Sequence, residues 1–136
     1  GAPAITTVTF RPTSLNQGEL VYISVTVTNN SGAPLPTQGP NPGFIYNEGD
    51  NYFTKQNPPV SGAYRIGLDF DGRTGVDHPY RWGFGAPLAP GQSTTVTGYI
   101  RLNRRQATNF WVALIQEATA VVQDNQGTTL VTVNKG

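Results

Sequence analysis

Apolar and polar residues alternate along much of the chain, and the clearest example is the segment Glu19–Thr28. Its sequence, ELVYISVTVT, places apolar residues two positions apart, at Val21, Ile23, Val25 and Val27. Side chains two apart lie on the same face of a β-strand, so the pattern predicts a strand with one buried and one solvent-exposed face. The same alternation returns at Ser93–Leu102, after the turn signal Ala89-Pro90-Gly91.

Several other runs have the composition and spacing of strands. We expect long strands at Ala4–Phe10, Glu19–Thr28, Ala63–Phe70, Ser93–Leu102 and Asn109–Ala118, and short ones at Phe44–Tyr46 and Tyr80–Phe84. Residues 14–18 favour a turn, and residues 120–123 and 128–134 are expected to pair as a closing hairpin through Asp124-Asn125-Gln126-Gly127. No segment has the period of a helix. Seven to nine short strands predict an all-β fold, an immunoglobulin-like antiparallel β-sandwich.

Residues 32–62 interrupt this pattern with a long irregular excursion. The segment holds most of the prolines of the chain and few periodic positions. A loop of this length inside a compact domain is uncommon and is usually functional or disordered. Its aromatic and aliphatic residues, Phe44, Ile45, Tyr46, Tyr52 and Phe53, need packed partners, so we expect an ordered excursion within a single domain spanning residues 1–136.

Composition narrows the classes of function. The 136 residues carry nine Lys and Arg against eight Asp and Glu, a net charge of +1, and there is no Cys. A nucleic-acid-binding surface needs a concentrated basic face, so no nucleic-acid partner is expected. No apolar run approaches the roughly 20 residues that span a bilayer, so membrane insertion is not expected either. Low charge and Thr-rich strands favour a secreted protein, extracellular or at a cell surface.

Three segments carry a resemblance to known families: VYISVTVTNNSGAPLP, LAPGQSTTVTGYIRL and FWVALIQE. They resemble bacterial extracellular immunoglobulin-like domains, namely the cell-adhesion-related CARDB-type domain and the four-tryptophan domain of selective-autophagy receptors. In both families a strand ending in Thr-Asn and a small residue precedes a Pro-containing loop, and a Leu-x-Pro-Gly turn introduces a later strand. The resemblance covers about half the chain, which departs from both patterns in its two tryptophans, Trp82 and Trp111, and its longer excursion.

The resemblance implies an immunoglobulin-like fold and a non-catalytic role in adhesion, cell-surface architecture or spacing between domains. The residues themselves also argue against an enzyme. The single histidine, His78, has no Gly-x-Ser-x-Gly motif or other nucleophile context, which favours a loop residue. Nothing in the sequence places Glu48, Asp50 and Glu117 opposite one another as glycosidase carboxylates. We therefore expect no catalytic residues.

The strongest candidate for a metal site is Asp69-Phe70-Asp71-Gly72 together with Asp77. Calcium takes six to eight oxygen ligands, and an Asp-x-Asp-Gly turn can direct two carboxylates at one ion. The alternative is that Asp69 ends a strand and Asp71-Gly72 forms a hairpin turn, since position 73 is Arg where a calcium loop needs another acid. No cofactor is expected apart from this calcium ion.

The aromatic residues of the irregular half, Tyr46, Tyr52, Tyr80 and Trp82, allow two interpretations. Exposed rings among polar neighbours can stack on the apolar face of a sugar, because Tyr and Trp combine an apolar body with a polar end. The other interpretation is a second small core that covers the open side of the sandwich. Trp111 is expected in the main core more firmly than Trp82.

Two hypotheses of function follow. The first is a secreted, non-catalytic module with a structural or adhesive role, whose partners are other protein chains, including copies of itself. Its Thr-rich N-terminal strand, with Ile5, Val8 and Phe10, could be donated to a neighbouring molecule by strand addition. The second is a carbohydrate-binding module that takes a polysaccharide on the rings of the irregular half.

Overall fold

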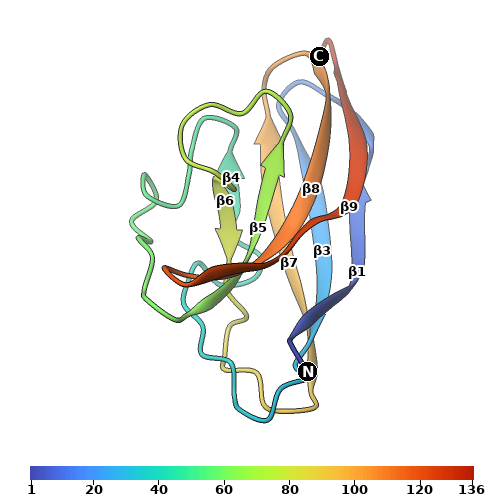
Figure 1. The fold of residues 1–136 in the computed structure, drawn as a ribbon. Coiled ribbons are helices and arrows are strands. Elements are labelled where there is room, and N and C mark those ends of the chain that lie inside the picture. Colours follow the sequence, from blue (N-terminus) through green and yellow to red (C-terminus); the bar gives the residue numbers. More distant parts are fainter.

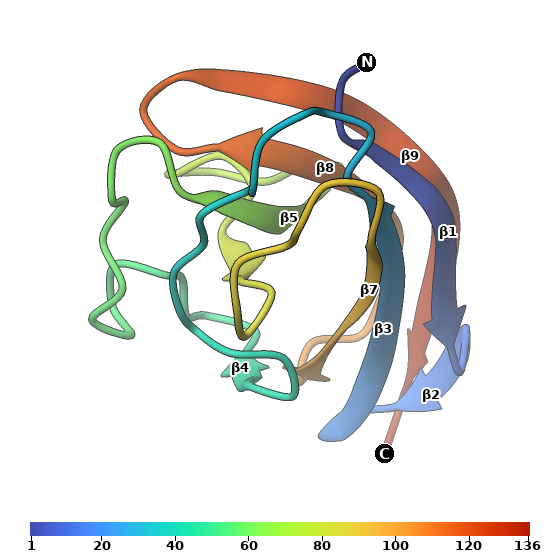
Figure 2. The same cartoon turned by 90° about the horizontal axis from the view of Figure 1, so that it is seen from below.

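The computed structural model describes residues 1–136 and contains nine strands and no helix. Four strands form the first sheet, in the order β1 (Ala4–Arg11), β3 (Glu19–Thr28), β7 (Ser93–Leu102) and β4 (Ile45–Asn47). Five form the second, in the order β2 (Ser14–Asn16), β9 (Ala120–Asn134), β8 (Gln106–Gln116), β5 (Tyr64–Phe70) and β6 (Tyr80–Trp82). The two sheets face each other as layers (Figures 1 and 2), which confirms the immunoglobulin-like β-sandwich.

The alternation in β3 does what the sequence predicts. Its inward residues are each at most 1% exposed: Val21, Ile23, Val25 and Val27. They face the core between the sheets, where they meet inward residues of β5 and β8 such as Leu68 and Leu114. This core is continuous from one sheet to the other. The structure contains no helix that could span a membrane.

The predicted closing hairpin is wrong. Residues 120–134 form the single strand β9, and the hairpin turn lies earlier, between β8 and β9 at residues 117–119. The turn-forming residues 124–127 are absorbed as bulges, because the register of β9 against β8 shifts three times between Phe110 and Ile115. Residues 14–18 differ too, since Ser14–Asn16 pair in parallel with β9 before the turn begins.

The irregular excursion is ordered and follows the side of the sandwich where β4 and β6 lie (Figure 1). Leu35 forms a bridge with Leu88, and Thr37 forms one with Tyr64. At Gly83 the two backbones approach so closely that a Cβ would lie 1.6 Å from the carbonyl oxygen of Gln38. Only a residue without a side chain fits there, so this glycine fixes the path of the excursion.

Rings from both halves of the chain form an aromatic cluster: Phe44, Tyr46, Tyr80 and Trp82. The Tyr46 ring meets the Trp82 ring edge-on at 5.2 Å between centroids, and the Tyr80 ring at 5.4 Å. Tyr46 and Trp82 are 0% exposed. Tyr46, Tyr80 and Trp82 belong to the same buried core as the inward residues of β3, so they are buried as the second interpretation expects but do not form a separate core. Trp111, expected to be the more firmly buried tryptophan, is only half-buried.

Trp82 lies directly against the backbone of β7, across the core from its own sheet. A Cβ added at Gly98 would lie 2.2 Å from Cε2 of Trp82, and the indole Nε1 donates a 2.9 Å hydrogen bond to the Phe44 carbonyl. The indole therefore fills the space that a side chain at position 98 would need, and only glycine fits there.

We therefore predict that Gly98→Ala destabilises the fold by about 1–3 kcal/mol, the usual cost of forcing extra atoms into a packed core. Denaturant unfolding measures the loss. Gly32→Ala is the matched control, because nothing lies within 4 Å of its Cβ position. Equal stability of the two variants would contradict the prediction.

Candidate functional site

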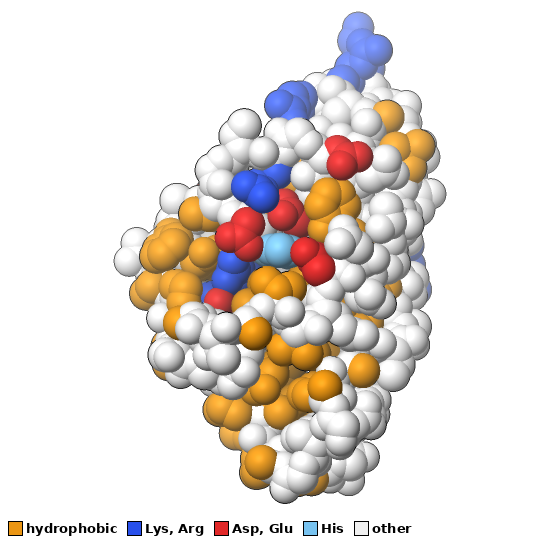
Figure 3. All heavy atoms as spheres, viewed as in Figure 1, with side chains coloured by type: hydrophobic (Ala, Val, Ile, Leu, Met, Phe, Trp, Pro, Cys, Tyr) orange, Lys and Arg blue, Asp and Glu red, His pale blue; other side chains and the backbone are white.

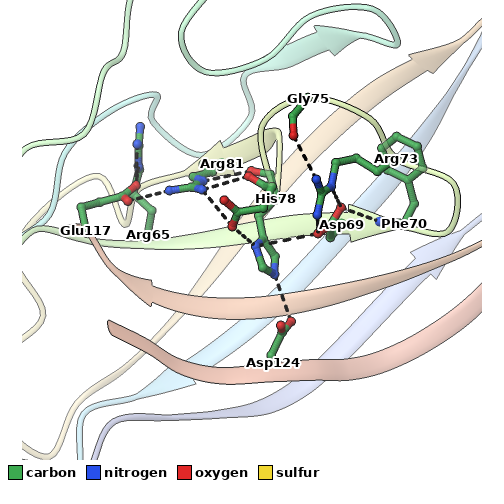
Figure 4. Close-up of polar contacts among 10 residues, drawn as sticks. Arg65, Asp69, Phe70, Arg73, Gly75, His78, Arg81, Glu117 and Asp124 are labelled. Carbon is green, nitrogen blue, oxygen red and sulfur yellow. Dashed lines mark hydrogen bonds and ion pairs between the residues drawn. The ribbon is translucent and has the colours of Figure 1, made fainter. Parts of the chain in front are cut away.

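Eight ionisable side chains form one charge network on the outer face of the second sheet (Figure 4): Arg65, Asp69, Arg73, Asp77, His78, Arg81, Glu117 and Asp124. They come from β5, β6, the loop between those strands, the β8–β9 turn and β9. The register places Arg81 of β6 opposite Gly67 of β5, so the network follows these two strands. It is the densest group of charges in the protein.

Glu117 is the centre of one half of the network. Its Oε2 accepts a 2.6 Å hydrogen bond from Nε of Arg65, and its Oε1 accepts one of the same length from Nη1 of Arg81. Arg65 is 0% and Glu117 1% exposed. Arg65 also donates through Nη1 to the carbonyls of Gly39 and Asn57, both at 3.0 Å. The Glu117 carboxylate therefore binds two buried guanidinium groups, and that of Arg65 also binds backbone carbonyls of the excursion.

His78 is the centre of the other half. Its Nδ1 lies 2.7 Å from Oδ2 of Asp77 and 3.9 Å from Oδ2 of Asp69, while its Nε2 lies 3.0 Å from Oδ1 of Asp124. The side chain is 5% exposed and rests on Gly67, where a Cβ would come within 3.0 Å of the His78 Cβ. A carboxylate oxygen therefore lies within hydrogen-bond distance of each ring nitrogen, and the imidazole is held from both sides.

The remaining groups extend and cover the network. Nε of Arg73 donates to Oδ1 of Asp69 at 3.0 Å. The ring of Tyr52 lies over the two buried arginines, 4.2 Å from Cζ of Arg81 and 5.1 Å from Cζ of Arg65. This cation–π contact excludes water from one side of the network.

Burial and pairing shift several pKa values. Burial lowers the pKa of Arg65, although Glu117 acts in the opposite direction. Burial would raise the pKa of Asp77, but the hydrogen bond from His78 and the charge of Arg81 outweigh it and leave the pKa lowered. In the aromatic cluster, burial raises the pKa of Tyr46 to about 12 and also raises that of Tyr80.

The three carboxylates of the predicted calcium site are not arranged around a common ion. Asp69 accepts from Arg73, Asp77 contacts His78 and Arg81, and Asp71 accepts from Nδ2 of Asn109 at 3.3 Å. No group of three or more His, Asp or Glu side chains is placed to hold a metal. Asp69 and Asp77 thus pair with guanidinium groups, and the structure does not bring the three carboxylates together around one point.

The predicted sugar-binding rings are also not exposed. Tyr46, Tyr80 and Trp82 belong to the aromatic cluster, and Tyr52, within the excursion, is 5% exposed with its ring against Arg81. The hydroxyl of Tyr46 donates to the Arg81 carbonyl at 2.8 Å, so its polar end is also used inside the protein. None of the four offers a free flat face to a sugar.

A polar hollow of about 530 Å³ adjoins the network. Three loops line it, residues 48–51, 70–80 and 103–104, with Glu48, Asp50, Arg73 and Arg104 among them. The Glu48 carboxylate accepts from the backbone N–H groups of Asn103 and Arg104 at 2.7 and 3.1 Å. In Figure 3 several acidic and basic side chains gather around the pale blue imidazole, and the lowest part of this face shows no charged side chain.

The network has the form of a structural element. An acid or base catalyst must reach a substrate proton within hydrogen-bond distance, yet His78, Asp69 and Glu117 are each at most 5% exposed and directed at other protein groups. Sequence analysis missed the Arg65–Glu117–Arg81 part. The available signal was a charged residue inside or directly after an otherwise apolar strand, as in YRIGL and LIQE, which indicates a buried ion pair.

The predicted assembly strand lies within its own sheet. The register pairs Phe10 with Ile23 and Val8 with Val25 on β3. Ile5 and Phe10 are buried and Val8 is partly buried. On the free side of β1, the Ile5 N–H donates to Oε1 of Gln123 at 2.6 Å. This hydrogen bond uses one of the backbone N–H groups at the edge of the first sheet.

Replacing Glu117 by Gln leaves buried Arg65 without a counter-charge and leaves Arg81 with only the more distant carboxylate of Asp77, at 3.5 Å. We predict a loss of about 3–5 kcal/mol in the free energy of unfolding, as for other broken buried pairs. Denaturant unfolding is the measurement, and Glu19→Gln, at an exposed carboxylate, is the control. A loss no larger than about 1 kcal/mol, typical of a surface pair, would overturn this view of the network.

The lowered pKa of Asp77 predicts a pH dependence of stability. Since its pKa lies below the ordinary value of 3.8 in the folded chain, its contribution is present above that pH and is lost as the pH falls through the folded-state pKa. Asp77→Asn should therefore be less stable than the parent near neutral pH, with the difference shrinking in acid. Urea unfolding over a pH series tests this against exposed Asp71→Asn; a constant difference would refute it.

Comparison with known proteins finds the same fold in solved structures, at low sequence identity. No protein-family model matches the chain, and no curated protein matches it. Among solved structures, the CARDB domain of a Pyrococcus furiosus protein, crystallised with di-metal ions, aligns at a TM-score of 0.55 and 15% identity, covering 99% of this chain and 96% of that one. The solution structure of that domain aligns at 0.52.

A second match is the alkylpurine DNA glycosylase AlkC of Pseudomonas fluorescens, bound to DNA with an abasic site analogue. It aligns at a TM-score of 0.56 and 12% identity, covering 98% of this chain and 31% of that one. The CARDB match, by contrast, spans both chains almost completely. The resemblance noted in the sequence is thus confirmed at the level of structure: the chain has the immunoglobulin-like sandwich fold of a CARDB domain.

Proposed function

We propose that the chain is a non-catalytic module that acts outside the cell in structure or adhesion. The observation that carries this proposal is that the groups best suited to acid–base chemistry are buried in mutual ion pairs. Glu117 binds two arginines, and His78 lies between Asp77 and Asp124. Such a network stabilises loops, and it directs its buried members, His78 and Glu117, at other protein groups.

The full-length likeness to a CARDB domain supports the same proposal, because that domain type is named for cell adhesion. The AlkC match is consistent with it as well, since the fold there makes up 31% of a longer chain. A sandwich of this kind serves as one module among others. Low charge and Thr-rich strands support an extracellular location.

A structural role also offers a mode of assembly. β1 contacts its own sheet along one edge, through β3, and connects to the rest of the chain at its C-terminal end. Its buried side chains, Ile5 and Phe10, fill positions in the core. A neighbouring molecule that supplied the same strand would bury the same residues, so β1 is the segment we propose to be exchanged between copies.

Deleting residues 1–10 tests this assembly. Light scattering should show assemblies of the intact protein and none of the shortened chain. A synthetic peptide of residues 4–11 should bind the shortened chain and restore its thermal stability. Each buried apolar side chain of β1 contributes about 1.5–3 kcal/mol, which the peptide returns. Deletion of the exposed residues 135–136 is the control.

If the intact chain is strictly monomeric, or the deletion assembles as before, exchange of β1 is refuted while the structural module remains. The non-catalytic part of the proposal fails separately. Turnover of any substrate that disappears in His78→Gln, with the fold intact by circular dichroism, would contradict it.

A further inference from the structure

The outer face of the first sheet carries a row of side chains that crosses all four strands. The register places Arg11 of β1 opposite Tyr22 of β3, Tyr22 opposite Tyr99 of β7, and Tyr99 opposite Ile45 of β4. Residues paired in this way share one face of a sheet. We call these four the aromatic row. Neighbouring strands lie about 4.8 Å apart, so the row is about 14 Å long.

The members of the row contact one another and remain open to solvent. The rings of Tyr22 and Tyr99 have centroids 5.3 Å apart at 55°, and Cζ of Arg11 lies 4.5 Å over the Tyr22 ring. Both rings are half-buried and Ile45 is 47% exposed. The neighbours of these tyrosines along the strands, Val21, Ile23 and Ile100, face the core instead. The outer surface of the row is therefore available to a ligand.

Hydroxyl groups continue this face along β3 and β7. Below the aromatic row the outward residues are Ser24, Thr26 and Thr28 on β3 and Thr97, Thr95 and Ser93 on β7. Thr26 and Thr95 hydrogen-bond through their hydroxyls at 3.2 Å, and Thr28 and Ser93 at 2.7 Å. From Tyr22 to Thr28 the strand rises about 20 Å. A flat track of this length fits several units of a polymer.

The charge on this face is of one sign. Arg101, opposite Leu20 and two residues from Tyr99, lies next to the row. Neither Arg11 nor Arg101 forms an ion pair, whereas Arg65, Arg73, Arg81 and Arg104 all do. Glu19, at the start of β3, alternates to the opposite face and accepts from the Asn16 N–H. Two guanidinium groups thus flank the tyrosine pair without a carboxylate partner.

We propose that this face binds an anionic polysaccharide, a glycan chain that carries carboxylate or sulfate groups. The tyrosine rings stack on the apolar C–H face of a sugar. Arg11 and Arg101 pair with its acidic substituents, since guanidinium groups match carboxylate and sulfate geometry. The Ser and Thr hydroxyls bond to sugar hydroxyls further along. The inference rests on the proposed adhesive function and names its ligand.

Charge complementarity decides between this ligand and its competitors. Arg101 donates only to the Gly18 carbonyl, at 2.6 Å, so a neutral glycan would leave both arginines without a counter-charge. A nucleic acid needs many cations to neutralise its phosphates, and this face supplies two within a chain of net charge +1. An acidic glycan carries about one charge per sugar or less, which two arginines on a track of about 20 Å can match.

Native gel electrophoresis through polygalacturonate tests the proposal on the full chain. We expect the polymer to retard the intact protein, and Tyr22→Ala and Tyr99→Ala each to weaken retention by about tenfold. Arg11→Gln, an exposed change at the end of β1, should weaken it and reduce its dependence on salt. Phe53→Ala is the aromatic control, since Phe53 is 50% exposed and packs on Tyr52 instead. Arg105→Gln is the charge control, at an exposed residue of the β7–β8 turn.

Absence of retention, or equal retention of the parent and both tyrosine variants with intact folds, overturns the proposal. So does equal retention by hydroxyethylcellulose, which is neutral, or stronger binding to single-stranded oligothymidine. A failure of this kind leaves the structural module in place. The proposed function fails instead if the polygalacturonate is cleaved, which the release of reducing ends in the same samples would show.

Discussion

The ion pairs of Glu117 with Arg65 and Arg81 are the constraint on which the arrangement of the irregular half depends. Removing charged groups from water costs several kcal/mol for each ion, so they are stable only where every partner is in position. Here the partners come from β5, β6 and the β8–β9 turn. Arg65 also requires the carbonyls of Gly39 and Asn57, which belong to the excursion. The excursion is therefore ordered by the charges it buries as well as by its rings.

The two outer faces of the sandwich consequently have different roles. The face of the second sheet is covered by the excursion, the β5–β6 loop and Tyr52, and its charges are used within the protein. The face of the first sheet carries no such cover, and its tyrosines and hydroxyls stay accessible. A module with one internally satisfied face and one open face can bind on one side while the other maintains its shape.

How much the sequence predicts depends on the range of the interactions. Alternation in β3 and β7 is local, so both strands and the sandwich follow from it. The hairpin predicted for residues 120–134 is wrong because Asp124-Asn125-Gln126-Gly127 has the composition of a turn. In the structure these residues stay paired with β8 and form bulges. The charge network and the aromatic row need a register between strands distant in sequence, such as Tyr22 with Tyr99. Asp69 and Asp77 of the predicted calcium site contact arginines four residues further along the chain, Arg73 and Arg81, but only the fold of the segment between β5 and β6 turns these side chains toward each other.

The two ends of the chain lie at opposite ends of the sandwich (Figure 1). A pull applied through them runs along the strands. β1 then slides against β3, and the hydrogen bonds of that antiparallel ladder stand perpendicular to the force. Bonds in this orientation share the load and break together, whereas a hairpin pulled from one end opens bond by bond. Domains of this kind joined in series would form a tether that resists extension.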